Sequence, residues 1–235
     1  MVLQLLILLF IAFLPPLFYM IWIRNTERYE REPWKPVLLS FAWGATVAII
    51  ASLVLEIVLS IPLALSIDEY TVQSFIAAVL IAPFVEEFTK PLALGMKSVR
   101  TNLDELEDGL IYGAAAGLGF SATENLFYEA SFMSEGLLLF TVLVLIRTVG
   151  GCLLHASATA LTGYGYGRSL LERRAFSSVL PFFMMAVGAH AFYNFIVSFE
   201  LIGALAGIGI ALLFAVLAIR FIRKKIKALD RENER

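Results

Sequence analysis

The sequence predicts an all-α membrane protein, a polytopic transmembrane helix bundle of about seven helices, with the N-terminus outside and the C-terminus in the cytoplasm. Three observations lead to this fold class. The 235 residues are 60% hydrophobic and only 16% charged, with a mean hydropathy of +0.83, which leaves too little polar surface for a soluble globular protein. The apolar residues fall into runs long enough to cross a bilayer. The basic residues gather in every second connecting loop.

Seven apolar runs reach the roughly 20 residues that a transmembrane helix needs. They cover residues 2–23, 37–61, 74–95, 109–130, 137–166, 179–199 and 201–222. The first run has no basic segment before it and no small-residue cleavage site, so we expect an anchor and not a removable signal peptide. We therefore expect residues 1–235 to form a single integral membrane domain in the cell membrane.

Lysine and arginine alternate sharply between the connecting loops. The segments after the first, third, fifth and seventh runs carry them, whereas the loops after the second, fourth and sixth runs contain none. Because cytoplasmic loops are enriched in Lys and Arg, this pattern predicts the orientation given above. It makes residues 223–235 a basic cytoplasmic tail, which we expect to lie against anionic lipid headgroups. We expect no nucleic-acid partner.

The first two helices carry few polar residues of interest. Pro15 and Pro16 predict a kink in the first helix. The loop of residues 24–35 mixes arginine with glutamate and ends at Trp34, a residue type that favours the membrane interface. We expect this loop to be solvated at the headgroup surface. Glu56 lies near the outer end of the second helix and should reach water.

The third run contains two carboxylates and an ammonium between Pro83 and Pro91. Charged side chains are costly inside a bilayer and occur there only when they face protein, a partner or water. Glu86 and Lys90 are one helical turn apart, whereas Glu87 points away. We expect one carboxylate to pair with Lys90 and the other to stay free. An ion pair that only fixes helix packing would not explain the second acid.

Polar residues also interrupt the next three helices. Gly113 and Gly117 in the fourth run predict a close helix contact, but they do not explain the Glu124-Asn125 pair that follows. Arg147 and His155 in the fifth run project from nearly the same stripe, with Gly151 between them leaving space. His190 and Asn194 share a face in the sixth run. Both histidines of the chain thus lie inside predicted spans.

These residues form one candidate site on four helices. Its members are Glu86, Glu87, Lys90, Glu124, Asn125, Arg147, His155, His190 and Asn194. Imidazole and carboxylate groups are common ligands of a catalytic zinc, which keeps an open position for water. A remaining carboxylate would then be the general base, with Asn or Arg stabilising the oxyanion. Alternatively, a glutamate activates water without a metal, helped by histidine.

Two other classes of function use similar residues. A proton-coupled secondary transporter also buries Glu, His, Arg and Lys, although the chain shows no internal repeat of helices. Uptake into proteoliposomes that survives Glu86→Gln and Glu87→Gln would favour it. A noncatalytic membrane scaffold predicts that these substitutions change only stability.

The motifs occur in a fixed order along the chain. They are Glu86-Glu87-Phe88-Thr89-Lys90, Asp108-Gly109-x-x-Tyr112-Gly113, Gly119-Phe120 leading to Glu124-Asn125, then His155, and His190-x-x-x-Asn194. As a set they resemble the PrsW family of intramembrane proteases, which is distantly similar to the CAAX prenyl-protease and bacteriocin-processing group. That group has a Phe-x-x-x-His motif, and Glu124 stands where it would place the histidine. The resemblance covers residues 83–194, which we expect to be the catalytic core helices.

The resemblance implies cleavage of a single-pass membrane protein, in the family's best-known case an anti-sigma factor, during regulated proteolysis. It implies that Glu86 and Glu87 are the catalytic acid pair. The further predicted catalytic residues are His190, Asn194, Lys90 and Arg147. The predicted ligands of a metal, expected to be zinc, are Glu87, Glu124, His155 and His190. With the predicted topology, Glu124 lies nearer the outside than Glu86, so either a tilt or kink closes that gap or Glu124 stands behind the metal ligands.

Overall fold

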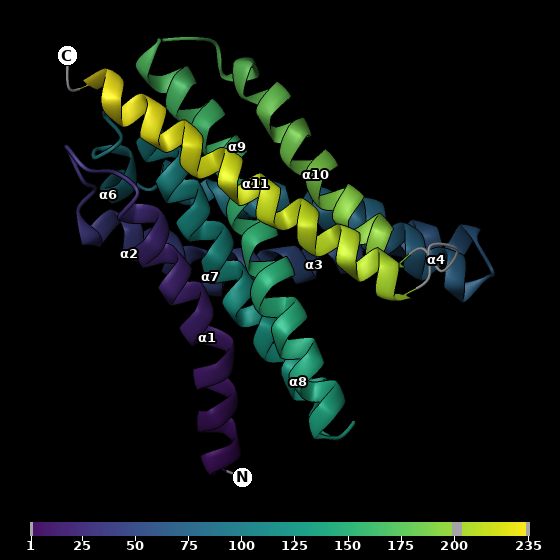
Figure 1. Ribbon diagram of the computed structural model, residues 1–235. Helices are drawn as coiled ribbons and strands as arrows, with labels where there is room; N and C mark the ends of the chain where they lie inside the picture. The colour runs from purple at the N-terminus through teal and green to yellow at the C-terminus, as the bar shows by residue number, and fades with distance from the viewer. Residues whose placement is uncertain (1, 199–203, 234–235) are drawn as a thin grey trace.

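The computed structural model describes residues 2–198 and 204–233, and every regular element in them is a helix. Phe199 and Leu201, at the predicted boundary between the sixth and seventh spans, lie outside the described residues. The α-helices are α1 (Val2–Arg24), α2 (Trp34–Trp43), α3 (Ile49–Ser66), α4 (Tyr70–Ile76), α5 (Ala82–Thr89), α6 (Lys97–Arg100), α7 (Leu106–Phe132), α8 (Leu137–Ile146), α9 (Cys152–Leu171), α10 (Leu180–Ser198) and α11 (Ala204–Asn233), shown in Figure 1. The π-helical turns are η1 (Gly44–Ala48), η2 (Ala77–Ile81) and η4 (Arg147–Gly151), and the 3₁₀ segments are η3 (Lys90–Gly95) and η5 (Phe176–Val179).

Six helices in the described part of the chain are long and apolar enough to cross a membrane. They are Val2–Arg24, Trp34–Ser66, Tyr70–Gly95, Leu137–Leu171, Phe176–Ser198 and Leu205–Glu232. The predicted fourth span is also a helix, α7, but it is not apolar enough to belong to this set. Helix α7 is surrounded by other helices, so small side chains that allow close packing suit it better than the large apolar side chains that face lipid in other spans. The polytopic helical fold is confirmed, and the protein is a multi-pass integral membrane protein.

Helix α7 lies at the centre of the fold and packs most closely on α9. Nearly every residue from Glu107 to Ala122 is buried. The two helices run in opposite directions, since Gly113 of α7 faces Thr159 and Gly117 faces His155. A methyl group on either glycine would overlap the carbonyl oxygen of its partner in α9. The close contact predicted from the glycine spacing is therefore confirmed, and it brings the backbone of α7 against the turn of α9 that carries His155.

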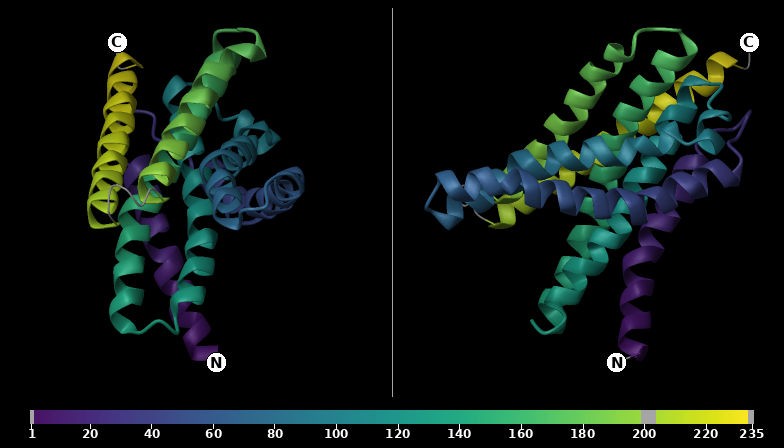
Figure 2. Two further views of the ribbon diagram at one scale, coloured as in Figure 1. Left: turned by 90° about the vertical axis from the view of Figure 1, so that its right-hand side faces the viewer. Right: turned by 180° about the vertical axis from the view of Figure 1, so that it is seen from behind.

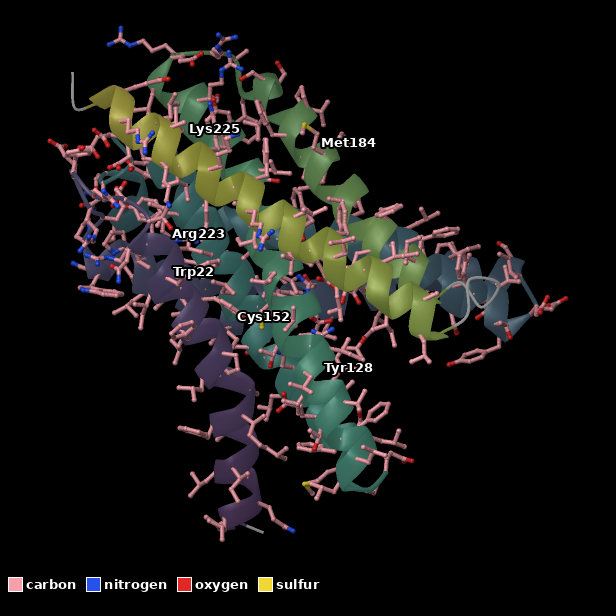
Figure 3. All side chains as sticks on the ribbon, in the orientation of Figure 1. Trp22, Tyr128, Cys152, Met184, Arg223 and Lys225 are labelled. Carbon is pink, nitrogen blue, oxygen red and sulfur yellow. The ribbon has the colours of Figure 1, made fainter. Side chains whose placement is uncertain are left out.

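The helices diverge from this central pair. In Figure 1, α1 and the hairpin of α7 and α8 extend to one end of the molecule, whereas the hairpin that contains α3 and α4 extends to the side. The two additional views show α11 on the side opposite the hairpin that contains α3 and α4, with α10 packed against both α11 and α5 (Figure 2). Helix α11 crosses α1 near Trp22, where the Arg223 guanidinium stacks 3.7 Å from the indole ring (Figure 3).

Segments predicted to be cytoplasmic meet at one end of the fold. The backbone N–H groups of Arg28 and Tyr29, in the loop after α1, donate to the Asp230 carboxylate of α11. The Tyr112 hydroxyl of α7 donates to Glu32 in that loop and to the carbonyl of Asn102 before α7. These segments share one side of the molecule, as the charge pattern requires. Which side of the membrane this is stays a prediction.

The loop after α1 is exposed at most of its positions, as expected, but not at all of them. Arg24, Thr26, Glu27 and Glu32 are buried, Glu27 completely. At these four residues the expectation was wrong, because a polar composition does not show that neighbouring segments cover part of the loop. The C-terminal tail is likewise not separate from the bundle, because α11 continues to Asn233 with one apolar face against the core. That face is Ile219, Ile222, Ile226 and Leu229.

Candidate active site

Helix α5 carries the paired acids between two departures from α-helical geometry. The π-helical turn η2 ends just before Pro83, and the chain continues after Thr89 as the 3₁₀ segment η3, which contains Pro91. Proline has no N–H to donate, so it disturbs the regular hydrogen bonds of the turn before it. The two prolines thus delimit a short α-helix that holds Glu86 and Glu87. Both acids are buried.

Lys90 is completely buried and contacts both acids. Its Nζ lies 2.8 Å from Glu86 Oε2, 2.9 Å from Glu87 Oε1 and 2.8 Å from His155 Nδ1. The ammonium also lies 4.2 Å from the centre of the Phe120 ring. The expectation that one carboxylate stays free of Lys90 was wrong, because the long side chain reaches residues three and four positions back alike. All three ammonium protons have a partner.

Glu87 is fully enclosed by polar partners. Its Oε1 lies 3.0 Å from His190 Nδ1, and its Oε2 accepts a hydrogen bond of 2.9 Å from the Thr159 hydroxyl. With Lys90, this gives the carboxylate three partners from three different helices or turns. Glu87 therefore fixes the His190 ring and locks α5 to α9 and α10. Its side chain has no exposed surface.

Glu124 stands on the far side of His155. Its Oε2 lies 2.8 Å from His155 Nε2 and accepts a hydrogen bond of 2.5 Å from Arg147. Arg147 also donates from Nε to Asn125 Oδ1 at 2.8 Å, and its guanidinium lies 4.5 Å from the ring centre of Tyr128, which is labelled in Figure 3. The depth difference expected between Glu124 and the α5 acids is thus bridged by the imidazole of His155.

The two histidines follow the same pattern. His155 has one nitrogen against Glu124 and the other directed towards Glu86, with Nδ1 3.8 Å from Glu86 Oε2. His190 has one nitrogen against Glu87 and the other, Nε2, 4.0 Å from the same Glu86 oxygen. A carboxylate that holds one ring nitrogen fixes the tautomer and aims the other nitrogen, the usual support for a metal-binding histidine.

Glu86, His155 and His190 each offer a ligand atom within 4.8 Å of the others. Two imidazoles and one carboxylate form a common ligand set of catalytic zinc, in which bonds of about 2.0–2.2 Å leave a fourth position open. This donor set fits a metal. Of the predicted ligands, His155 and His190 belong to this group together with Glu86, whereas Glu87 and Glu124 contact the outer nitrogens of the two rings, and the identity of the metal ligands stays a prediction. The Lys90 ammonium is bonded to two of the same donor atoms, so it must move when they bind a metal.

A cavity of about 620 Å³ borders the site. Of the predicted site residues, six line it: Glu86, Glu124, Arg147, His155, His190 and Asn194. Glu87 and Lys90 do not line it. Asn194 is held by donation from Nδ2 to the Ala78 carbonyl at 2.8 Å. The remaining wall is largely apolar and comes from α3, η2, α7, α8 and α10. An apolar polypeptide segment that enters this cavity would therefore pass along a largely apolar wall and reach the polar side chains of the candidate site.

The structure adds residues that the sequence did not single out. Glu56, expected to reach water near a helix end, is half-buried and lines the same cavity. Thr159 donates to Glu87, and the Ser52 hydroxyl lies 2.7 Å from that of Thr89 on the helix of the paired acids. Burying a hydroxyl group within a membrane helix costs little free energy, because it can bond to the backbone of its own helix. Isolated Ser and Thr residues in a span therefore do not stand out in the sequence as candidate site residues. Glu56 could have been found as a further acid within a predicted span.

Comparison with known proteins identifies the family of the chain. A family model described as PrsW family intramembrane metalloprotease matches residues 32–221. A protein named Protease PrsW from Clostridioides difficile (strain 630) is 33% identical over 122 residues, which are 52% of this chain and 50% of that protein. Another with the same name from Geobacillus kaustophilus (strain HTA426) is 26% identical over 168 residues, 68% of each chain. The chain thus spans about half the length of the first relative. No solved structure is significantly similar to the chain.

The family match extends beyond the site to α2 at one end and into α11 at the other, so it covers most of the helices described above. The members of this family are peptidases. The chain belongs to the PrsW family of intramembrane metalloproteases.

Proposed function

We propose that the protein hydrolyses a peptide bond of a single-pass membrane protein at the Glu86, His155 and His190 cluster. The observation that carries the proposal is the convergence of three ligand atoms at the wall of a cavity inside a membrane-embedded bundle. A transporter of protons would need an acid that exchanges partners along a path. Here the carboxylates of Glu87 and Glu124 are held by fixed hydrogen bonds that aim two histidines at one point.

Glu86, His155 and His190 would hold the metal, for which we propose zinc. A zinc ion in such a set supplies a water that ionises near neutral pH and an electrophile for the scissile carbonyl. Glu87 keeps His190 oriented from outside the cluster, and Glu124 does the same for His155.

The other groups at the cavity complete the assignment. Glu124 lines the cavity, unlike Glu87, but it stands on the far side of His155, so its role is to hold that ring and not to activate the attacking water. Arg147 holds Glu124 and presents a positive charge to the cavity. The Asn194 amide lies on the same wall and can donate to a developing oxyanion.

The substrate class follows from the cavity wall. Apolar side chains such as Ile49, Leu53 and Phe127 line most of it, which suits a segment that leaves the lipid. In a transmembrane helix each peptide group is bonded within the helix, so the substrate must unwind where it meets the polar cluster. We therefore propose a single-pass membrane protein with a helix that opens readily, an anti-sigma-factor-like protein cleaved in regulated proteolysis.

The test combines metal analysis of the purified protein with cleavage of a co-reconstituted single-pass substrate. We expect about one zinc per chain in the wild type, and loss of both zinc and cleavage in Glu86→Gln, His155→Ala and His190→Ala. Glu124→Gln should weaken zinc retention and lower cleavage about 10–100-fold, as expected when outer support of a histidine ligand is lost. Glu69→Gln, at an exposed residue of the loop before α4, is the matched control.

Cleavage that continues without bound metal and in the presence of a chelator would replace the zinc mechanism with a glutamate-type one, in which Glu86 activates water. Proton-coupled uptake without any cleavage would remove the protease assignment altogether.

A further inference from the structure

A second group of buried carboxylates lies at the end of the fold where the loop after α1 meets α7. Glu27 and Glu32 belong to the loop, and Asp108 belongs to the first turn of α7. Each of the three is at most 3% exposed. One oxygen from each lies within 4.8 Å of the others, which is close enough to share one cation. None of them belongs to the candidate active site.

Glu27 has an oxygen without a partner. Its Oε2 accepts a hydrogen bond of 2.7 Å from the backbone N–H of Glu32, but its Oε1 is buried and makes no hydrogen bond. A buried carboxylate oxygen without a donor is costly and needs an explanation such as an ion or water. The residue is completely buried, so bulk water does not supply that donor.

No basic side chain neutralises these acids. Among the described residues, no Lys, Arg or His nitrogen lies within the 4.0 Å limit of an ion pair with Glu27, Glu32 or Asp108. The nearby arginines donate to backbone carbonyls instead, Arg24 to that of Glu32 at 2.6 Å and Arg31 to that of Glu27 at 3.2 Å. The arginines therefore support the backbone of the loop and make no ion pair with these carboxylates.

Other contacts build the loop into a fixed shape around the acids. Asp108 accepts the backbone N–H groups of Asp104 and Glu105, and the Tyr112 hydroxyl donates to Glu32. Asp230 of α11 accepts two backbone N–H groups from the other side of the loop. Three segments thus hold the oxygens in place before any ligand arrives, which lowers the ordering cost of binding.

We propose that Glu27, Glu32 and Asp108 form a binding site for a hard divalent cation, Ca²⁺ or Mg²⁺, which pins the loop after α1 to the start of α7. Both cations prefer oxygen ligands, and carboxylates are their usual protein ligands. The site contains no imidazole or thiolate, unlike the zinc-type set at Glu86, so the two sites differ in the metal they favour. Burial raises the pKa of Glu27 to about 8 and that of Glu32 to about 7, as expected for acids that lack a counter-ion.

The proposal is tested on the full chain in detergent by measuring the apparent unfolding temperature in chelator, in millimolar Ca²⁺ and in millimolar Mg²⁺. We expect one or both cations to raise the unfolding temperature of the wild type by several degrees, because a ligand that binds only the folded state stabilises it. The arm with the larger shift identifies the cation.

Glu27→Gln is the decisive variant. Above pH 8, where Glu27 carries its charge, it removes charge repulsion, so it should unfold at a higher temperature than the wild type in chelator, and it should lose the cation-dependent shift. Glu30→Gln, at an exposed position of the same loop, is the matched control and should behave like the wild type. Glu86→Gln should keep the shift, which separates this site from the active site.

Three results would overturn the proposal: no shift with either cation, a shift that survives in Glu27→Gln, or a shift that disappears in Glu86→Gln. If Glu27→Gln does not fold, terbium replaces calcium as the probe of the wild type. The Tyr112 ring, one hydrogen bond from Glu32, should then sensitise terbium emission that Ca²⁺ or Mg²⁺ displaces. Absence of that emission would also overturn the proposal.

Discussion

Two clusters of buried carboxylates in the same chain are stabilised in opposite ways. At the candidate active site, Glu86, Glu87 and Glu124 are matched by the cations Lys90 and Arg147. At the loop after α1, the three acids have no such partner in the described part of the chain. Both clusters contact α7, the first near Glu124 and the second at Asp108. One helix therefore connects a site that carries its own cations with a site that lacks them.

The difference shows what each cluster can bind. A carboxylate already bonded to an ammonium can bind a metal only if that ammonium moves, so Lys90 controls access to the active-site ligands. A carboxylate without a partner gains from any suitable cation. The first cluster suits a metal held by nitrogen and oxygen together, and the second suits a metal held by oxygen alone.

The largest effect is expected when the internal cation of the first cluster is removed. Lys90→Met leaves Glu86 and Glu87 buried without their ammonium, and breaking a buried pair in this way costs about 3–5 kcal/mol. We expect a large fall in the apparent unfolding temperature in detergent.

Lys97→Met, at an exposed position seven residues further on, is the control and should change little. Adding Glu87→Gln to Lys90→Met should restore part of the lost stability, because the two residues are coupled. If Lys90→Met is as stable as the wild type, the contrast between the two clusters is wrong.

The sequence was sufficient to predict the helices and six spans, of the seven expected, that are long and apolar enough to cross a membrane, and it singled out most of the side chains that meet at the candidate site. Hydropathy places helices well, and the cost of burying charge marks Glu86, Glu124 and Arg147 as special. It could not predict that Lys90 reaches both adjacent acids, since a flexible side chain permits several pairings. It also gave no sign of the π-helical turn at Arg147.

The second cluster was missed for a different reason. Loop composition is the same whether a loop is solvated or covered, and only tertiary contacts decide which. Glu27 and Glu32 become buried because α7 and α11 close over the loop from separate parts of the chain. The Asp108-Gly109 motif was recognised in the sequence, but its contacts with Glu32 depend on that closure.

A smaller effect is expected when a supporting acid of the first cluster is changed. Glu87→Gln keeps the shape of the side chain but removes the charge that orients His190. Loss of such outer support typically lowers metal affinity or activity 10–100-fold. We expect a fall in cleavage rate of about this size, together with weaker zinc retention during dialysis.

The Glu87→Gln result becomes informative when it is compared with that of Glu86→Gln, which changes a proposed metal ligand. Glu86→Gln should abolish cleavage, whereas Glu87→Gln should only reduce it. Equal and complete loss in both variants would place Glu87 among the metal ligands, as the sequence suggested.

The second cluster predicts a dependence of stability on pH. The pKa values of Glu27 and Glu32 are raised, to about 8 and about 7, because burial disfavours their charged forms. Between the ordinary glutamate pKa of 4.5 and these raised values, the folded chain binds more protons than the unfolded chain, so in chelator the unfolding free energy should fall as pH rises from about 5 to about 8 and then level off. Each group contributes at most about 1.4 kcal/mol per pH unit.

The groups around these acids act in the same pH experiment and must be included in its interpretation. They are Arg24, Arg31, Asp104, Glu107, Asp108, Tyr112 and Asp230. Saturating Ca²⁺ or Mg²⁺ should weaken the fall in stability, and Glu27→Gln should reduce it in chelator. If the unfolding free energy of the wild type in chelator does not change with pH, the acids are not buried as described.

The smallest effect on stability is expected when a contact near the second cluster is removed while its three acids stay unchanged. Arg223 of α11 donates from Nε to the Thr26 hydroxyl at 2.8 Å and stacks on Trp22, so it ties the tail to the loop. Arg223→Gln should lower the unfolding free energy by about 1 kcal/mol, the sum expected from one hydrogen bond and one cation–π contact partly replaced by water. Lys224→Gln, exposed on the same helix, is the control and should have no effect.

Because Arg223 does not contact the carboxylates, its variant should keep the full cation-dependent shift of the wild type. If that shift is lost, the tail and not the acids determines cation binding at this end of the fold.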